Sequence, residues 1–250
     1  MSKPQLYALD FDGVLCDSAL ETSITAWRAA RSHLWPKMPE HIPAEVIEQF
    51  KYVRPALETG YESILIVRLL FEGITADTLL NEFHHRLEGL IRRDQLDTEK
   101  LKQRFGSARD EWLKCDLPGW LKMNPLFPGI QTKLTSINSE HCFIITTKQE
   151  RFVEQILSAN KIPFPKEQIF GLDRKLSKQQ VLRELQDQYP NYPIVFLEDR
   201  LPTLINVMND HDLTNIQLVL ASWGYNTMQD EQQATKHHIK QINLHEFQHL

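Results

Sequence analysis

Cysteine is scarce in this chain of 250 residues, and its few cysteines are widely separated. The three stand at positions 16, 115 and 142, with no Cys-x-x-Cys pair and no Cys/His cluster. An odd number at such spacing argues against a disulfide framework and predicts free thiols in a reducing compartment. We expect no zinc site either, because His237, His238, His245 and His249 have no metal-ligand partners at a recognisable spacing.

Long apolar runs and an excess of basic charge are also missing. No stretch is long enough for a secretory signal peptide or a membrane span, so we expect a cytoplasmic protein without a membrane partner. The formal net charge is −5, so the chain as a whole is not built to coat nucleic acid or an acidic membrane. An anionic ligand would therefore need a local positive site.

Five short apolar runs end in polar residues, and helical patterns follow several of them. Near-continuous apolar runs of this length are typical of parallel strands buried on both faces. Apolar residues at helical spacing recur within 151–160, 178–189 and 202–209. This alternation predicts an α/β fold with a doubly wound, Rossmann-like parallel sheet. The expected strands are Leu6–Phe11, Cys142–Thr146, Gln168–Leu172, Ile194–Leu197 and Ile216–Ala221.

Residues 17–126 interrupt the alternation of strands and helices. Apolar residues recur there at helical spacing, first in Ile64–Phe71 and again in Leu79–Ile91, while strand signals are scarce. We therefore expect two domains. The α/β core comprises residues 1–16 and 127–250, and residues 17–126 form an all-helical insert after the first strand.

The strongest chemical signal is the run Asp-Phe-Asp-Gly-Val, which begins at Asp10 at the end of the first expected strand. In an open α/β sheet, ligands bind at the carboxyl ends of the strands. Asp10 and Asp12 flank a single residue, and Gly13 then permits a tight turn. One carboxylate of such a pair can attack phosphorus while its neighbour handles the proton of the leaving group.

This run resembles the first motif, D-x-D-x-[TV], of the haloacid dehalogenase superfamily, and the resemblance covers most of the chain apart from the helical insert. It implies that Asp10 is a nucleophile that forms an aspartyl-phosphate, and that Asp12 is the general acid and base. The turns Trp223–Tyr225 and Phe127–Gly129 are similar to those of phosphoglycolate-phosphatase-like members. The helical insert would then be a cap that excludes water and selects the leaving group.

Two further motifs of the superfamily concern the phosphate. Thr146 closes the second expected strand before a helix, where a hydroxyl and backbone N–H groups can hold phosphate oxygens. The resemblance assigns Thr146 and Thr147 to phosphate binding, although related phosphatases often have Thr-Asn-Lys here. A lysine that neutralises the phosphoryl group is expected at Lys178 or Lys175. A capping-box pattern places Lys178 in the first turn of a helix, where a cation is unfavourable unless an anion lies nearby, and this favours Lys178.

The fourth motif is acidic and ends the fourth expected strand. The resemblance implies that Asp199 binds a metal directly, while Glu198 acts from behind it or through water. Together with Asp10 and Asp12, these carboxylates would converge, and they cannot all stay ionised without a cation. All-oxygen ligation suits Mg²⁺. We therefore expect Mg²⁺ as the cofactor, held by Asp10, Asp12 and Asp199.

Within the insert, Arg54 is a candidate for contact with substrate, because Arg54, Glu58 and Tyr61 fall at positions i, i+4 and i+7. An exposed salt-bridged surface is the alternative. The leading hypothesis is Mg²⁺-dependent hydrolysis of a small phosphorylated metabolite, without nucleic acid as a partner. A phosphosugar mutase of the same superfamily and a catalytically silent binding domain are the alternatives. The sequence identifies neither the phosphate ester nor the oligomeric state.

Overall fold

The computed structural model describes residues 5–213 and 215–249, and the chain divides into two compact units. The first, here called the α/β unit, comprises Met1–Asp17 and Leu126–Leu250. The second, the helical unit, is the continuous segment Ser18–Pro125. The insertion therefore begins soon after the first strand has ended.

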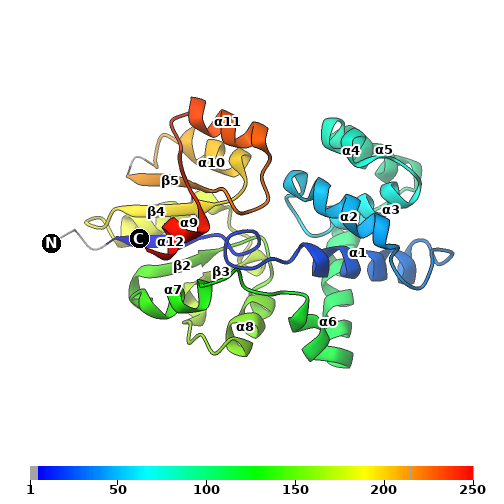
Figure 1. Cartoon of the computed structure of the whole chain (residues 1–250), viewed down its shortest axis with the longest axis horizontal. Coiled ribbons are helices and arrows are strands. Elements are labelled where there is room, and N and C mark those ends of the chain that lie inside the picture. The colour runs from blue at the N-terminus through cyan, green and yellow to red at the C-terminus, as the bar shows by residue number, and fades with distance from the viewer. Residues whose placement is uncertain (1–4, 214, 250) are drawn as a thin grey trace. The chain divides into compact units, whose positions relative to one another are not determined.

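A six-stranded parallel sheet forms the centre of the α/β unit (Figure 1). Its strand order is β3-β2-β1-β4-β5-β6, so the chain starts in the middle and winds outward in both directions. The central strands are almost wholly buried, as their apolar sequences predict. The predicted doubly wound α/β fold is thus confirmed. The strands are β1 (Leu6–Leu9), β2 (Cys142–Ile145), β3 (Ile169–Phe170), β4 (Ile194–Glu198), β5 (Ile216–Ala221) and β6 (Lys240–Ile242).

Three differences from the predicted strands exceed a single residue. The sequence analysis does not predict β6, because Lys240 is exposed and Gln241 is half-buried, so that no continuous apolar run marks the strand. β1 ends at Leu9 instead of Phe11, and a turn follows at Gly13–Leu15. β3 is shorter than expected because 3₁₀ turns lie at both of its ends.

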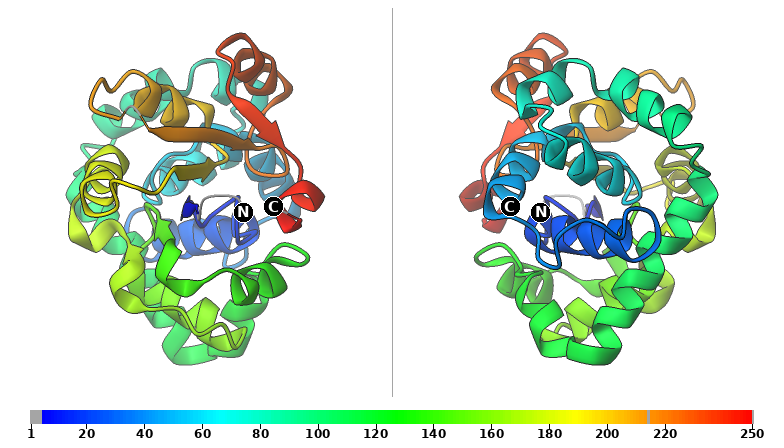
Figure 2. Two further views of the ribbon diagram at one scale, coloured as in Figure 1. Left: turned by 90° about the vertical axis from the view of Figure 1, so that its left-hand side faces the viewer. Right: turned by 90° about the vertical axis from the view of Figure 1, so that its right-hand side faces the viewer.

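Helices cover both faces of the sheet. The apolar side chains of α9 and α10 join Leu6, Ala8 and Phe196 in one core cluster on the first face, together with Ala234 of α11. α7 and α8 lie on the opposite side of the strands from α10 and α11, as the views in Figures 1 and 2 agree. The helices of this unit are α7 (Ile130–Ser136), α8 (Glu150–Ala159), α9 (Lys178–Gln188), α10 (Leu201–Met208), α11 (Met228–Lys236) and α12 (Leu244–Gln248).

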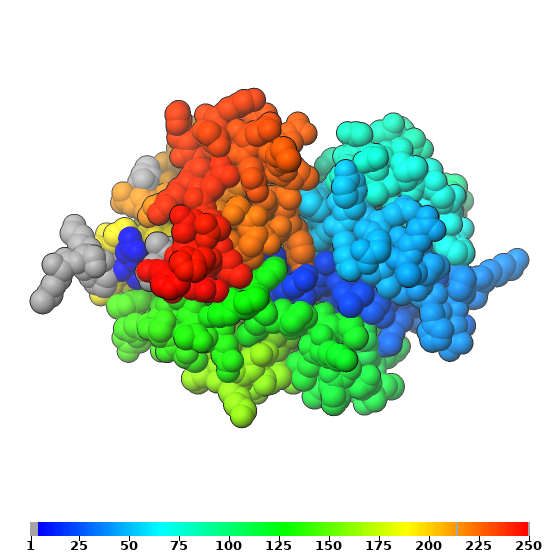
Figure 3. All heavy atoms as spheres, in the orientation of Figure 1, coloured from blue at the N-terminus to red at the C-terminus, as the bar shows by residue number. Residues whose placement is uncertain are grey.

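The last helix, α12, packs against the turn that precedes α7. Phe247 is fully buried, and its ring stacks on that of Trp223 with centroids 5.8 Å apart. The side-chain amide of Gln248 donates a hydrogen bond to the backbone carbonyl of Pro128. Figure 3 shows the C-terminal atoms in red lying against the green atoms of this segment.

The helical unit has its own core. Trp27, Phe50, Ile64 and Leu87, which come from four different helices, belong to one buried apolar cluster. The unit has the all-helical character that the sequence pattern indicates. Among the described residues of the chain, no helix is both long and apolar enough to cross a membrane. The helices are α1 (Ala19–His33), α2 (Ala44–Val53), α3 (Glu62–Phe71), α4 (Ala76–Asn81), α5 (Phe83–Arg93) and α6 (Thr98–Lys122).

A buried ion pair joins the first and last helices of this unit. The guanidinium of Arg109 in α6 donates to both carboxylate oxygens of Glu21 in α1, at 2.8 and 2.7 Å. Thr25 and Trp120 also donate to Oε1 of Glu21, at 2.6 and 3.0 Å. Because α6 is kinked at Asp116, the carboxylate contacts α6 on both sides of the kink. Glu21 is completely buried, so each of these donors compensates for its loss of hydration.

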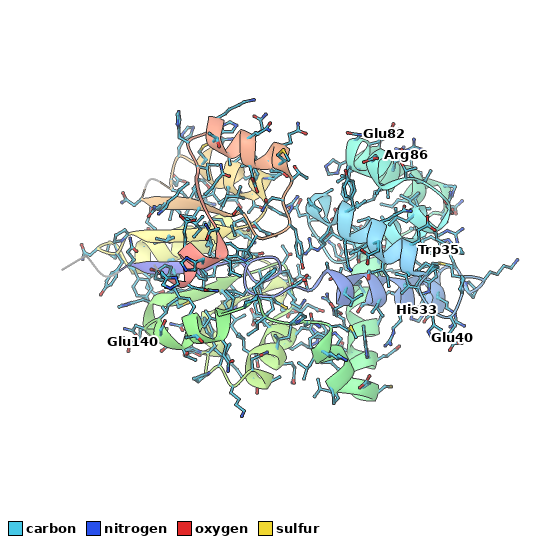
Figure 4. The ribbon with its side chains drawn as sticks, in the orientation of Figure 1. His33, Trp35, Glu40, Glu82, Arg86 and Glu140 are labelled. Carbon is cyan, nitrogen blue, oxygen red and sulfur yellow. The ribbon has the colours of Figure 1, made fainter. Side chains whose placement is uncertain are left out.

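Exposed ion pairs form on the surface of the helical unit, both within one helix and between segments far apart in the sequence. Arg86 and Glu82, one turn apart and both labelled in Figure 4, approach to 2.7 Å at the start of α5. Arg93 forms a second exposed pair with Glu72, at 2.7 Å. Exposed pairs of this kind contribute about 1 kcal/mol or less each.

The prediction that Arg54, Glu58 and Tyr61 lie on one face of a helix is wrong. α2 ends at Val53, Arg54 begins a single 3₁₀ turn, and Leu57 is extended with ψ of 127°. α3 begins only after Tyr61, which is its N-cap. Since no helix runs through 54–61, positions i, i+4 and i+7 do not share a face here.

Candidate active site

Polar side chains from three neighbouring strands meet at one edge of the sheet. Asp10 directly follows β1, Thr146 follows β2, and Glu198 is the last residue of β4. β1 lies between β2 and β4 and runs parallel to both, so the carboxyl ends of the three strands share this edge. The backbone N–H of Asp10 donates to the carbonyl of Leu197 at 2.9 Å, which extends the sheet hydrogen bonding to the site.

Lys178 binds two of these carboxylates. Its Nζ lies 2.6 Å from Oδ1 of Asp10 and 2.6 Å from Oε2 of Glu198. The predicted capping box is present, with Ser177 as the N-cap of α9, and it sets Lys178 at the first helical position. Lys175, the other candidate, is exposed and adopts a left-handed backbone with φ of 57°. Lys178 is therefore the candidate whose ammonium meets the aspartate of the first motif.

Burial is the largest single influence on the pKa values of Asp10, Lys178 and Glu198. It raises the pKa of Asp10 to about 7, because the nearby Lys178 offsets only part of the lost hydration. The negative charges of Glu198 and Asp12 raise the pKa of Asp10 further. Burial also disfavours the charged form of Lys178, but its two carboxylate partners outweigh this and raise its pKa. A further positive charge beside Asp10 would therefore favour its ionised form at neutral pH.

Glu198 is held with both of its oxygens engaged. Burial acts to raise its pKa, but Lys178 and several hydrogen bonds outweigh burial and keep that pKa below its usual value. Oε1 accepts hydrogen bonds from the backbone N–H groups of Asp199 and Arg200, at 3.2 and 3.0 Å. These contacts fix the orientation of the Glu198 carboxylate beside Asp10.

Asp199 occupies a narrow space between two glycine-containing turns. Its Oδ2 accepts a 2.7 Å hydrogen bond from the backbone N–H of Tyr225. A methyl group on Gly224 would lie 2.3 Å from Cβ of Asp199 and 2.5 Å from the carbonyl oxygen of Gly13. Glycine at position 224 thus permits the Trp-Gly-Tyr turn to approach both the acidic motif and the loop after β1.

The loop after β1 is braced by its own backbone. The N–H groups of Leu15 and Cys16 both donate to the carbonyl of Phe11 at 2.9 Å, and the N–H of Gly13 donates to the carbonyl of Cys16 at the same distance. Gly13 has φ of +91°, a conformation that L side chains rarely adopt. The tight turn that the sequence predicts is present, and it begins immediately after Asp12.

Thr146 and Thr147 have different surroundings. Thr146 is buried, and its Oγ1 accepts a 3.1 Å hydrogen bond from the backbone N–H of Lys148. Thr147 is exposed. Both precede the start of α8, where the first backbone N–H groups of a helix can receive an anion.

Lys148 is the site residue that the sequence analysis misses. Its side chain is fully buried, and its Nζ lies 2.9 Å from Oδ1 and 3.3 Å from Oδ2 of Asp12. The signal was the third position of Thr-Thr-Lys, which matches the lysine of the related Thr-Asn-Lys. The predicted phosphate-binding role includes only the two threonines of this motif.

The donor set of the site fits a hard divalent cation. Carboxylate oxygens of Asp10, Glu198 and Asp199 lie within 4.8 Å of one another. Counting Asp12, the site holds four carboxylates and the two ammonium groups of Lys148 and Lys178, which leaves an excess of negative charge that one divalent cation would neutralise. All of the available ligand atoms are oxygens, as Mg²⁺ prefers.

Arg54, the predicted substrate contact, lies in the helical unit. It is buried, and its Nη1 donates to the backbone carbonyl of Leu57 at 3.4 Å. By contrast, the four histidines near the C-terminus are all exposed, and none belongs to a potential metal-binding group among the described residues.

Comparison with known proteins identifies relatives by structure only. No protein-family model and no curated protein matches the sequence. A predicted phosphatase from Clostridium acetobutylicum is 16% identical, with a TM-score of 0.59 and coverage of 98% of this chain and 96% of that chain. A predicted phosphoglycolate phosphatase from Haemophilus somnus is 16% identical, with a TM-score of 0.58 and coverage of 92% of each chain.

A third structure, a hydrolase described as a haloacid dehalogenase-like family protein from Streptococcus pneumoniae, is 17% identical. Its TM-score is 0.55, and the match covers 98% of this chain and 95% of that chain. Identities this low show the fold alone. The chain therefore has the haloacid dehalogenase-like fold over nearly its whole length.

Proposed function

We propose that this protein is a Mg²⁺-dependent phosphatase that hydrolyses a small-molecule phosphomonoester through an aspartyl-phosphate on Asp10. The observation that carries the proposal is the bridge from Lys178 to Asp10 and Glu198, at 2.6 Å each, on the carboxyl edge of the sheet. A buried nucleophile beside an ammonium group is suited to a phosphoryl group, whose charge the lysine would offset. The shared fold supports the same class of reaction.

In the proposed first step, a carboxylate oxygen of Asp10 attacks phosphorus and the bond from phosphorus to the ester oxygen breaks. Asp12 in its protonated form gives its proton to the departing oxygen, so the alcohol leaves neutral. In the second step, Asp12 takes a proton from water as the water oxygen attacks the phosphorus of the intermediate. This step releases inorganic phosphate and regenerates the carboxylate of Asp10.

Several residues would bind the phosphoryl group without reacting. Lys178 supplies a positive charge, and Thr146 and Thr147 supply hydroxyl or backbone donors before α8. A bound Mg²⁺ would provide further positive charge that reduces repulsion between the phosphate and the nucleophile. The carboxylates of Asp10 and Asp199 and the backbone carbonyl of Asp12 would hold it.

The remaining parts of the proposal concern the substrate. The helical unit would act as a cap that selects the leaving group, with Arg54 as a candidate contact, and the substrate would be a small phosphorylated metabolite. A cytoplasmic location and the absence of a nucleic-acid partner stay predictions. The alternative, a phosphosugar mutase, would require a bisphosphate activator.

Turnover of p-nitrophenyl phosphate by the purified protein tests the proposal. Activity should require Mg²⁺, vanish with excess chelator and return when Mg²⁺ is restored. Ca²⁺ should support it poorly, because this ion takes more ligands at longer distances and would misplace the attacking carboxylate. Full activity in chelator would refute the metal requirement, and no activity with any ester of a phosphometabolite panel would refute the function. Dependence on glucose-1,6-bisphosphate would identify a mutase instead.

A further inference from the structure

Each of the two aspartates of the first motif has its own lysine. Lys178 contacts Asp10 and also Glu198, each at 2.6 Å. Lys148 contacts both oxygens of Asp12, at 2.9 and 3.3 Å, and among the described residues Asp12 is its one ion-pair partner. Neither lysine therefore pairs with the other aspartate in this arrangement.

The backbone of Lys148 is fixed on both sides. Its N–H donates to Oγ1 of Thr146 at 3.1 Å, and its carbonyl accepts from the N–H of Leu172 at 3.1 Å. A methyl group on Gly171 would lie 2.7 Å from that carbonyl oxygen, so the two segments are in close contact. The base of the lysine side chain is thus anchored between two loops of the sheet edge.

The side chain of Lys148 is not exposed at all, whereas that of Asp12 retains 16% of its exposure. An ammonium that has lost its hydration is stable only with a close counter-charge, so the pair restrains both partners. Because Nζ lies close to both oxygens of Asp12, rotation of that carboxylate would weaken at least one contact. Without the lysine, Asp12 would lose this charge-assisted restraint and would still be repelled by the neighbouring Asp10.

We infer that Lys148 is a positioning residue that holds the carboxylate of Asp12 in the orientation needed for proton transfer. The inference rests on the proposed function, in which Asp12 moves the proton. Lys148 itself does not touch the reacting atoms. Its effect on the reaction therefore passes through Asp12, and it should disappear when Asp12 can no longer transfer a proton.

A double-mutant cycle tests this inference, with the variants Lys148→Met, Asp12→Asn and the combination of both. Lys148→Met should lower kcat by about 10²-fold, the loss that a small misplacement of a catalytic group can cause, with little change in KM. In the Asp12→Asn background the same substitution should cause almost no further loss. Lys148→Arg should restore part of the activity, because it keeps the positive charge.

Lys133→Met serves as the matched control. Lys133 is also a buried lysine of the α/β unit, but its ammonium lies over the rings of Tyr7 and Phe247, at 5.9 and 5.5 Å from their centroids. Its replacement should leave kcat near the wild-type value. If it lowers kcat as much as Lys148→Met, loss of a buried lysine is a general structural effect and the inference is overturned.

Thermal unfolding gives a second measurement that does not depend on activity. Asp12→Asn leaves the ammonium of Lys148 buried without its partner, so this variant should melt at a lower temperature than the double variant. Equal melting temperatures would contradict the pairing.

The remaining outcomes are also decisive. Equal losses of kcat in both backgrounds, no loss in either, or a rise in KM alone would overturn the inference, the last by showing that Lys148 binds substrate. Wild-type protein without any turnover would refute the proposed function instead, and the inference would fall with it.

Discussion

A methyl group on Gly13 would lie 1.9 Å from Oδ2 of Asp199 and 2.8 Å from the ring of Tyr225. The same carboxylate oxygen accepts the backbone N–H of Tyr225. The loop after β1 and the acidic motif after β4 can therefore approach each other only because position 13 has no side chain. This approach brings Asp199 to the sheet edge that carries Asp10.

We predict that Gly13→Ala lowers Mg²⁺-dependent turnover by about 10²-fold or more, because Asp199 must move away from its hydrogen bond with the backbone N–H of Tyr225. The matched control is Gly73→Ala in the helical unit. Gly73 has φ of +92°, close to the +91° of Gly13, but a methyl group there meets nothing within 4 Å. Both variants should lose about 1–3 kcal/mol of stability from backbone strain. Equal turnover in the two variants would show that the contact with Asp199 has no role.

The second prediction concerns the leaving group. Asp12→Asn should be slowed by about 10²–10⁴-fold with an alkyl phosphate, because the departing alkoxide needs a proton. With p-nitrophenyl phosphate the defect in forming the phosphoenzyme should be much smaller, since nitrophenolate leaves without one. Single-turnover kinetics across esters of graded leaving-group acidity measures this. An equal defect for every ester would mean that Asp12 is not the general acid.

The third prediction concerns the buried ion pair of the helical unit. Arg109→Met leaves the carboxylate of Glu21 buried without its bidentate partner, and should lower the free energy of unfolding by about 3–5 kcal/mol. Lys102→Ala, which removes an exposed pair with Glu99, should change it by less than about 1 kcal/mol. Denaturant unfolding followed by tryptophan fluorescence gives both values. Similar losses in the two variants would contradict the importance of burial.

The fourth prediction concerns the thiols, which are all free as the sequence predicts. Cys16 and Cys142 are buried, and burial raises the pKa of Cys142 to about 12, with Lys133 acting weakly against it. Since thiolate is the reactive form, a thiol reagent at pH 8 should modify only the exposed Cys115 rapidly. Cys115→Ser should abolish the fast phase, and denatured protein should react at every cysteine. A fast phase that survives in Cys115→Ser would show that a buried thiol is accessible.

The sequence analysis could predict most of the convergence at the sheet edge, because topology gathers residues that follow parallel strands. The positions of Asp10, Thr146 and Glu198 follow from the predicted ends of the strands. The position of Lys178 follows from the capping-box pattern and from the unfavourable placement of a cation at the start of a helix. These are local patterns with one spatial consequence.

The features that could not be predicted depend on a long side chain that contacts a distant residue, or on weak local sequence patterns. Lys148 stretches from the end of β2 to Asp12, and no spacing in the sequence encodes that contact. β6 is short and partly polar, so tertiary pairing with β5 decides it. The spacing of Arg54 and Tyr61 predicts one helix, but α2 ends at Val53 and the chain is extended at Leu57.

The most direct test of the account is to detect the phosphoryl group on Asp10. Wild-type protein mixed with p-nitrophenyl phosphate and Mg²⁺ should be quenched rapidly in acid, digested and analysed by mass spectrometry. The account predicts one added phosphoryl group on the peptide that contains Asp10, and neither this adduct nor turnover in Asp10→Asn. Turnover by the wild type with the phosphoryl group on another peptide, or undiminished turnover by Asp10→Asn, would contradict it.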